Sequence, residues 1–283
     1  MKSPKNILKE FKKFIKQENL IQWNDKIITA VSGGIDSTVL LYLIKKTSAE
    51  YNLTILAVHI NYNLRGEESN ENEQFVRNLC YKWGIPLVVH HVEIKEKSNL
   101  ENKARKIRFS ILRDLLQKYE FQKIALGHNK NDQAETLLLN LFRGSGIGGM
   151  KGIIPKSKDI IRPLLALTRN EITEFAKQNN IEFSEDSSNL SLIYDRNKIR
   201  HKIIPEIEKG LNPKAVDKIS NSARIFQQTD SFLQEYCKEI FPEIVKKTDG
   251  NFYSFFHSFI FQLSPNLLKI FPFLYQLKDG LII

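Results

Sequence analysis

The sequence predicts an α/β protein in which a doubly wound, mainly parallel sheet precedes a small, mainly helical C-terminal domain. Short β-branched apolar runs alternate with longer segments whose apolar residues recur at helical spacing, a pattern typical of βαβ units. After Asn212-Pro213 the strand pattern stops, and a new helix with a long apolar stripe begins. We therefore expect two domains, residues 1–210 and residues 211–283.

The elements of the first domain follow from these patterns in chain order. An amphipathic helix is expected first, because apolar residues alternate with lysines at helical spacing. Strands and helices then alternate, which puts helices on both faces of a parallel sheet. The expected helices are residues 5–19, 38–45, 69–82, 99–118, 168–179 and one entered through 127–136; the expected strands are 27–31, 53–60, 85–91 and 123–126, with an extended piece at 160–165.

Charge and cysteine content restrict the class of protein. Lys+Arg 42 and Asp+Glu 32 give a net charge of +10, which suits a polyanionic partner such as nucleic acid. Cys80 and Cys237 are far apart in sequence, so neither a disulfide framework nor a zinc or iron–sulfur site is indicated. Neither a signal-peptide pattern nor a membrane-spanning apolar run is visible, so we expect no membrane partner and a cytoplasmic location.

A glycine-containing turn, Ser32-Gly33-Gly34-Ile35-Asp36-Ser37, joins the expected strand 27–31 to the helix after it. Free N–H groups at a helix start, and glycines that let a ligand approach the backbone, favour a bound phosphate. The Walker pattern is absent because no lysine follows the glycines. A carboxylate beside a polyphosphate needs a cation, so Asp36 predicts an Mg²⁺ site. The alternative is a plain turn capped by Ser32 or Ser37.

Polar residues follow two further strands. His59 and Asn61 lie at the end of the second strand, and Gly127-His128-Asn129 follows the fourth. Ligands bind at the carboxyl ends of parallel strands, so we expect these residues and the 32–37 turn to meet at one crevice.

Charged side chains on two helices are expected near the same crevice. Arg105 and Arg108 share a stripe beside a buried face, where a guanidinium can bind phosphate or a base edge. The alternative is a surface ion pair between Glu101 and Arg105. Asp132 and Glu135 lie on one face at a helix start, where the alternative is an approximate capping box.

For two later segments the sequence is compatible with either a functional or a purely structural role. Residues 142–152 contain five glycines and form either a mobile lid or only a linker. Residues 196–202 combine four cationic side chains with a histidine, which favours either phosphate contacts or a solvated helical face.

The turn at 32–37 resembles the PP-loop of the N-type ATP pyrophosphatases. Within that group, roughly residues 25 to 210 are similar to the tRNA(Ile)-lysidine synthase family, with the motifs in the family's order. The motifs are residues 59–66, 101–108, 127–136, 143–146, 162–164 and 186–205. Many members carry two C-terminal domains, whereas the residues after 210 suffice for one small domain.

This resemblance implies a PP-loop fold of the adenine nucleotide alpha hydrolase type. It implies a ligase that uses ATP and Mg²⁺ to join L-lysine to C2 of the wobble cytidine in a tRNA(Ile) with a CAU anticodon. The reaction passes through an adenylated cytidine and releases pyrophosphate and AMP. A homodimer is compatible with the sequence. The alternatives are a PP-loop tRNA cytidine thiolase and a non-catalytic module that binds nucleotide or RNA.

The resemblance also implies site roles. Asp36, Asp132, Arg105 and Arg108 would be catalytic, with Asp36 and Asp132 at the metal. The residues expected to bind the nucleotide are Ser32, Gly33, Gly34, Ile35, Asp36, Ser37, His59, Gly127 and His128. Contacts with tRNA or lysine fall to Asn61, Arg65, Glu135, Arg143, Arg196, Asn197 and Arg200.

Overall fold

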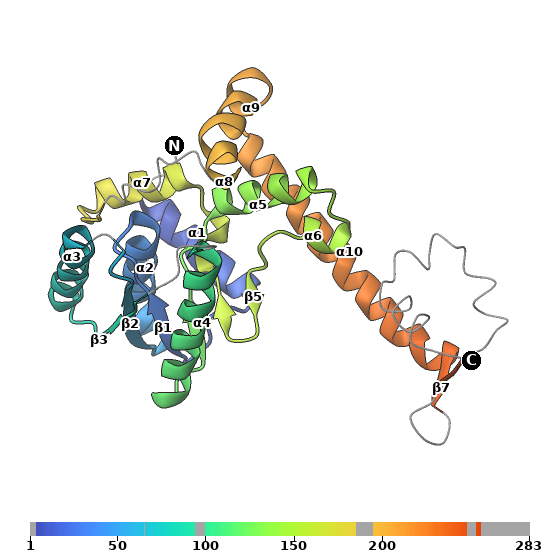
Figure 1. The fold of residues 1–283 in the computed structure, drawn as a ribbon, viewed down its shortest axis with the longest axis horizontal. Helices are drawn as coiled ribbons and strands as arrows, with labels where there is room; N and C mark the ends of the chain where they lie inside the picture. The colour runs from blue at the N-terminus through green and yellow to red at the C-terminus, as the bar shows by residue number, and fades with distance from the viewer. Residues whose placement is uncertain (1–3, 65, 94–99, 185–194, 248–252, 256–283) are drawn as a thin grey trace. The chain divides into compact units, whose positions relative to one another are not determined.

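The structure is a computed structural model that describes residues 4–64, 66–93, 100–184, 195–247 and 253–255 (Figure 1). Contacts divide the chain into two units, Met1–Phe226 and Gln227–Ile283, and the division falls inside one long helix. The first unit contains the sheet and is described first. The domain boundary expected at residue 210 stays a prediction.

A six-stranded sheet has the strand order β3-β2-β1-β4-β6-β5. Its strands are β1 (Lys26–Ala30), β2 (Thr54–Asn61), β3 (Leu87–His91), β4 (Lys123–Ala125), β5 (Lys156–Ser157) and β6 (Ile160–Ile161). All neighbouring strands are parallel except β5, which runs antiparallel to β6 at the edge. The predicted mainly parallel α/β sheet is therefore confirmed.

Helices follow the strands in the expected alternation. They are α1 (Pro4–Gln17), α2 (Ile35–Tyr51), α3 (Glu67–Trp83), α4 (Leu100–Lys118), α5 (Lys130–Phe142), α6 (Ile147–Met150), α7 (Arg169–Gln178), α8 (Asp195–Lys198), α9 (Ile204–Gly210) and α10 (Ala215–Ile244). A π-helix, Ile199–Ile203, connects α8 to α9. The glycine-rich stretch 142–152 thus contains the short helix α6.

The piece expected to be extended at 160–165 is extended only in β6. Pro163 begins a 3₁₀ helix, Pro163–Ala166. A proline at the start of a helix has its φ already near the helical value and lacks an N–H that would be unpaired there anyway. The expectation of an extended piece is therefore wrong for residues 163–165, which belong to this 3₁₀ helix.

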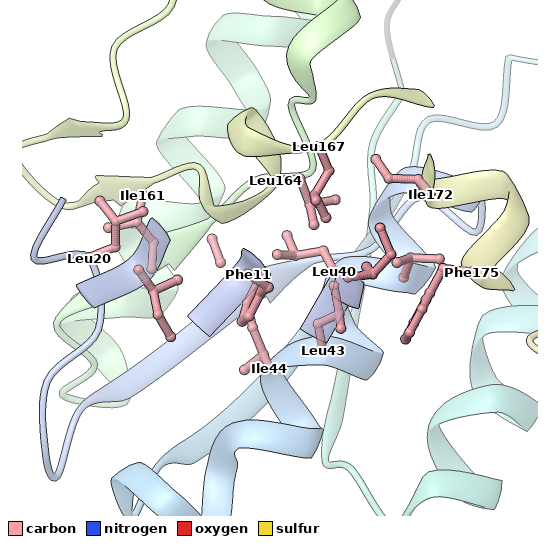
Figure 2. Close-up of a cluster of buried hydrophobic side chains, with 14 of the residues drawn as sticks. Phe11, Leu20, Leu40, Leu43, Ile44, Ile161, Leu164, Leu167, Ile172 and Phe175 are labelled. Carbon is pink, nitrogen blue, oxygen red and sulfur yellow. The ribbon is translucent and has the colours of Figure 1, made fainter. Parts of the chain in front are cut away.

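Alternate residues of β1 pack against opposite faces of the sheet. Ile27 belongs to a buried cluster that includes Phe11 of α1, Leu40 of α2 and Phe175 of α7 (Figure 2). Ile28, the next residue, belongs to a cluster formed with α4. Helices therefore cover both faces, and the carboxyl ends of β1, β2 and β4 remain together at one edge.

The second unit begins within α10. After this helix, β7 (Val245–Lys247) pairs antiparallel with β8 (Tyr253–Phe255). The expectation of a mainly helical C-terminal region is met by α10, to which the structure adds this short strand pair. Within the described parts of the chain, no helix is both long enough and apolar enough to cross a bilayer.

Candidate functional site

A cleft of about 1190 Å³ lies at the carboxyl ends of β1 and β2. The predicted site residues among its lining are Ser32, Gly34, Ile35, Asp36, Ser37, His59, Asn61 and Arg200. Further lining comes from α3 and α7, through Asn72, Arg169, Thr173 and Lys177. The predicted residues that do not line it are Gly33, Arg105, Arg108, Gly127, His128, Asp132, Glu135, Arg143, Arg196 and Asn197.

The 32–37 loop forms a closed turn that leaves the start of α2 open. The Ser37 hydroxyl accepts a hydrogen bond from the Ser32 N–H at 3.1 Å and donates to the Gly34 carbonyl at 2.9 Å. Gly34 is the N-cap of α2, and no side chain caps the helix. Of the alternative, a turn capped by Ser32 or Ser37, the structure shows the part in which Ser37 closes the turn, but neither serine caps the helix. The first N–H groups of α2 have no capping side chain, which suits a bound anion.

Gly33 is required by the shape of this loop. Its φ is +89°, a conformation that other residues adopt only with strain. A Cβ atom there would also lie 2.1 Å from the Asn72 side-chain oxygen. The Asn72 amide donates to the Ser32 carbonyl at 2.7 Å, so α3 holds the loop from outside.

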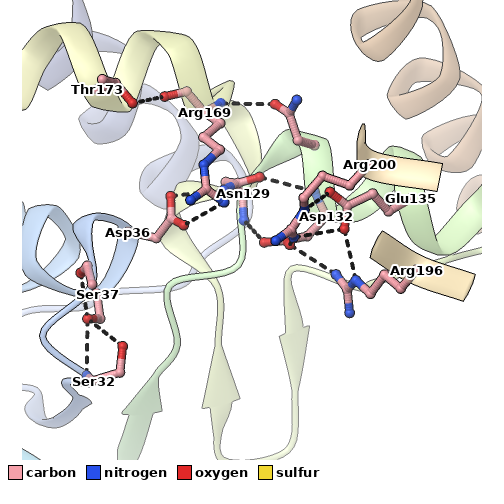
Figure 3. A network of polar contacts seen from close by, with 12 residues as sticks. Ser32, Asp36, Ser37, Asn129, Asp132, Glu135, Arg169, Thr173, Arg196 and Arg200 are labelled. Atoms are coloured by element: carbon pink, nitrogen blue, oxygen red, sulfur yellow. Dashed lines mark hydrogen bonds and ion pairs between the residues drawn. The ribbon is translucent and has the colours of Figure 1, made fainter. Parts of the chain in front are cut away.

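Asp36 lies in the first turn of α2, beside the open N–H groups. The Asn129 amide donates to its Oδ1 at 2.9 Å, and the Arg169 guanidinium is 3.8 Å from its Oδ2 (Figure 3). Burial raises the pKa of Asp36, and the charge of Arg169 opposes that change only in part. A nearby cation would stabilise the charged carboxylate.

Asp36 is a single carboxylate, and a single carboxylate suits Mg²⁺ better than it suits a metal whose ligands all come from the protein. Among the described residues, no three His, Cys, Asp or Glu side chains cluster as metal ligands. Mg²⁺ commonly takes one or two carboxylates and completes its shell with phosphate oxygens and water. Asp36 can supply that carboxylate.

The end of β4 packs directly onto the start of α2. A Cβ atom on Gly127 would lie 3.1 Å from backbone atoms of both Asp36 and Ser37. Asn129 caps α5 and forms a capping box with Asp132, whose Oδ2 accepts from the Asn129 N–H at 2.9 Å. The alternative capping box between Asp132 and Glu135 is thus wrong, because the box lies three residues earlier.

Two carboxylates and two guanidiniums form a closed network next to the cleft (Figure 3). Asp132 Oδ1 accepts from Arg196 and Arg200, each at 3.0 Å. Glu135 accepts from Arg196 Nε at 2.8 Å and from Arg200 Nε at 2.6 Å. The Glu135 side chain is only 1% exposed, so its charge depends on these arginines.

The element that carries the two arginines is a short helix followed by a π-helix. Arg196 lies in α8, and Arg200 lies in the π-helix. π-Helical segments are rare and often occur at functional sites. Burial tends to lower the pKa of Arg200, but the hydrogen bonds and charge of Glu135 raise it overall.

Burial is the main cause that lowers the pKa of two histidines at the strand ends. His59 lies 2.8 Å from the Val31 carbonyl through Nδ1, and burial lowers its pKa. Burial and the charges of Arg162 and Arg196 lower the pKa of His128 to about 3. Within the described chain, His128 Nδ1 has no hydrogen-bond partner. His128 thus lies among arginines rather than in the cleft lining.

Among the remaining predicted residues, those that the structure describes lie outside the cleft lining. The guanidiniums of Arg105 and Arg108 lie 5.6 Å and 5.7 Å from the centre of the Phe109 ring on α4. Arg143 is exposed at the end of α5, and Asn197 is half-buried in α8. Arg65, the Glu101 side chain and the block 186–189 lie outside the described residues.

Sequence reasoning missed Arg169, although a signal for it was present. Thr168 and Glu171 form the expected capping box at the start of α7, and Arg169 is the first residue of that helix. Its N–H binds the Asn131 side chain at 2.9 Å, which joins α7 to the start of α5. The capping box marks the start of the helix, so the sequence does place an arginine in its first turn, where it could be a candidate site residue.

Comparison with known proteins adds a family match. The family model described as PP-loop domain matches residues 4–207. The tRNA(Ile)-lysidine synthase of Caldanaerobacter subterraneus subsp. tengcongensis is 37% identical over 235 residues, 81% of this chain and 50% of the relative. The tRNA(Ile)-lysidine synthase of Clostridium perfringens strain ATCC 13124 is 38% identical over 240 residues, 83% of this chain and 51% of the relative. The chain spans about half the length of these curated relatives.

A solved structure shows the same fold. The U34-tRNA thiolase NcsA from Methanococcus maripaludis, determined with its 4Fe-4S cluster, matches with a TM-score of 0.66. The match covers 78% of each chain at 20% sequence identity. This similarity supports the doubly wound architecture.

Proposed function

The chain belongs to the PP-loop domain family, and on that premise we propose that it ligates L-lysine to the wobble cytidine of a tRNA(Ile) with a CAU anticodon, using ATP. The observation that carries the proposal is the uncapped start of α2 with the half-buried Asp36 beside it. The names of the relatives, tRNA(Ile)-lysidine synthase, support the choice of substrates.

The chemistry has two steps. The 2-oxygen of cytidine attacks the α-phosphorus of ATP, and pyrophosphate leaves. The lysine ε-amine then attacks C2, and AMP leaves with the oxygen while the amine loses a proton. Because a free ε-ammonium has a pKa of about 10.4, the site must favour the neutral amine or supply a base.

Residues of the 32–37 loop would bind the phosphates of ATP. The open N–H groups at the start of α2 offer donors for the leaving pyrophosphate, and Gly33 and Gly34 let it approach the backbone. Asp36 would hold Mg²⁺, which supplies a positive charge against the leaving pyrophosphate. His59, Gly127 and His128 complete the proposed nucleotide set.

Asp132 and Glu135 would bind the ammonium group of lysine. Their oxygens accept hydrogen bonds from Arg196 and Arg200 in this structure, so both carboxylates already pair with cationic groups. Asp132 is also the proposed second carboxylate near the metal and a candidate proton acceptor.

The remaining cationic residues would contact the tRNA. Arg105, Arg108, Arg196 and Arg200 would meet the RNA strand or the charge that develops on the phosphate. Arg65 and Arg143, with the uncharged Asn197, would also contact the RNA. The net charge of +10 favours association with a polyanion. Such an enzyme would act in the cytoplasm, where its tRNA substrate is found.

A tRNA thiolase is the second candidate, because a thiolase shares the fold. The chain has only two cysteines, Cys80 and Cys237, and they form no Cys-x-x-Cys pair. Burial raises the pKa of Cys80 to about 11, which disfavours the thiolate needed for sulfur chemistry. The cysteines therefore favour the ligase.

Release of AMP tests the proposal against both alternatives. The protein is incubated with ATP and a tRNA transcript that carries C at the wobble position, and AMP is measured with and without lysine. A ligase releases AMP only with lysine and only with the C transcript. Nucleotide binding without turnover would support a non-catalytic module, and full AMP release without lysine would support another PP-loop chemistry.

A further inference from the structure

The connection from β2 to α3 forms one wall of the cleft. Ile60, Asn61, Tyr62 and Leu64 all line it. Asn63 has a φ of 48°, so the chain turns sharply inside this wall. A side-chain hydrogen bond holds this turn in place beside the cleft.

Asn61 provides this interaction with its side chain. Its Oδ1 accepts a hydrogen bond from the Asn63 N–H at 2.8 Å. Its Nδ2 donates to Glu73 Oε2 at 2.9 Å and to the Ser69 carbonyl at 3.4 Å. The Asn61 residue is only 3% exposed. The amide therefore uses its donors and its acceptor within the protein rather than on a ligand.

Glu73 of α3 fixes the orientation of the Asn61 amide. Its Oε1 accepts from Arg77 Nε at 2.9 Å, and its Oε2 lies 2.8 Å from His91 Nε2. His91 is the partner of Asn61 in the β2–β3 register, so three elements meet at this carboxylate. Burial opposes its charge, but the donors Asn61, Arg77 and His91 lower the pKa of Glu73 to about 2. An ionised carboxylate forces Asn61 to point its NH₂ group toward Glu73.

We infer that Glu73 and Asn61 form a latch that positions the Tyr62–Leu64 wall of the nucleotide cleft. Both are positioning residues, since they act through the backbone turn and through Tyr62. The inference rests on one part of the proposed function, namely that the cleft binds ATP. It assigns to α3 a role in nucleotide affinity, in addition to the contact of Asn72 with Ser32.

This latch is tested by exchanging the hydrogen-bond donor and acceptor between positions 61 and 73. The quantity measured is the affinity for ATP in the absence of RNA and lysine. Asn61→Asp places two carboxylates face to face, and Glu73→Leu leaves the Asn61 NH₂ without its acceptor. Each should weaken ATP binding about tenfold, the scale of one hydrogen bond to a charged group. The double variant Asn61→Asp/Glu73→Gln restores a donor and an acceptor in reversed order. Its affinity should return to within about threefold of the parent.

A matched control lies on the same helix. Glu71 is exposed two positions before Glu73, so Glu71→Leu should bind ATP as the parent does. Melting temperatures identify loss of fold, because a merely structural contact would lower the melting temperature without changing the ATP affinity of the folded protein. Parental affinity in folded Asn61→Asp would overturn the inference, as would a double variant no better than Asn61→Asp.

Failure of the latch and failure of the proposed function give different results. A parent protein that binds ATP but transfers no lysine contradicts the ligase, while the swap experiment still decides the latch. A parent protein that does not bind ATP overturns the latch, because its wall would then not belong to a nucleotide cleft.

Discussion

Glu135 lies almost completely buried between Arg196 and Arg200, so its charge has little contact with water. Removal of one member of a buried ion pair leaves the other charges uncompensated. We expect Glu135→Gln to lower the free energy of unfolding by about 3 kcal/mol in urea titrations. The exposed Glu206 provides the control, and Glu206→Gln should change stability by less than about 0.5 kcal/mol. Equal stability of the two variants would contradict this account of the network.

His128 should make stability depend on pH. Its pKa falls from 6.5 to about 3 on folding, so the unfolded chain binds more protons between these values. Stability from the neutral imidazole is complete above pH 6.5 and is lost as the pH falls toward the folded pKa.

His128→Asn should remove this dependence. Between pH 6.5 and about pH 5, the parent should lose up to about 1.4 kcal/mol per pH unit relative to the variant. Urea titrations at several pH values measure the difference in the free energy of unfolding between parent and variant. His59 is present in both proteins, so its contribution cancels in this difference. Parallel pH profiles for parent and variant would show that folding does not lower the pKa of His128.

Residue identity alone could not reveal which charges pair. The sequence indicated Asp132, Glu135, Arg196 and Arg200 as site residues, but it left solvated and capping roles open. The pairs join positions 61 to 68 residues apart, and no local pattern specifies such partners. The orienting roles of Asn129 and Glu73 were missed for the same reason.

At the scale of elements, the packing of β4 against α2 sets the geometry of the phosphate site. Gly127→Ala places a methyl group 3.1 Å from backbone atoms of Asp36 and Ser37, and backbone cannot move aside as a side chain can. We expect this variant to weaken ATP binding about tenfold while it remains folded.

Gly148→Ala is the matched control for this prediction. A Cβ atom on Gly148 meets no atom within 4 Å, so ATP affinity should stay at the parental value. Calorimetric titration with ATP measures both variants. If Gly127→Ala binds as tightly as Gly148→Ala, the close contact between β4 and α2 does not shape the phosphate site.

The elements themselves were largely predictable, and the exceptions have physical reasons. Buried parallel strands are apolar on both faces, so β1 and β2 appear as continuous β-branched runs. Strands β5 and β6 have two residues each, too short for any periodicity. The π-helix at Ile199–Ile203 has no simple signal in sequence, because it depends on the contacts of Arg200 and Ile199 with α5.

At the scale of the whole molecule, the family match and the candidate site both concern the first of the two units. The family match ends at residue 207, and the cleft with its polar network lies within Met1–Phe226. The sequence predicted this α/β unit and the place of its site because strand ends and glycine turns are local features. No motif marks a role for the residues after 226.

Transfer of lysine to RNA tests the central claim most directly. The protein is incubated with ATP, labelled L-lysine and tRNA(Ile) transcripts that differ only at the wobble base, and label in the RNA is counted. We predict label in the C transcript alone, and none with Asp36→Asn, which should still bind tRNA because Asp36 contacts Asn129 and Arg169 within the cleft. Folded protein that binds ATP and tRNA but leaves the C transcript unlabelled would contradict the account.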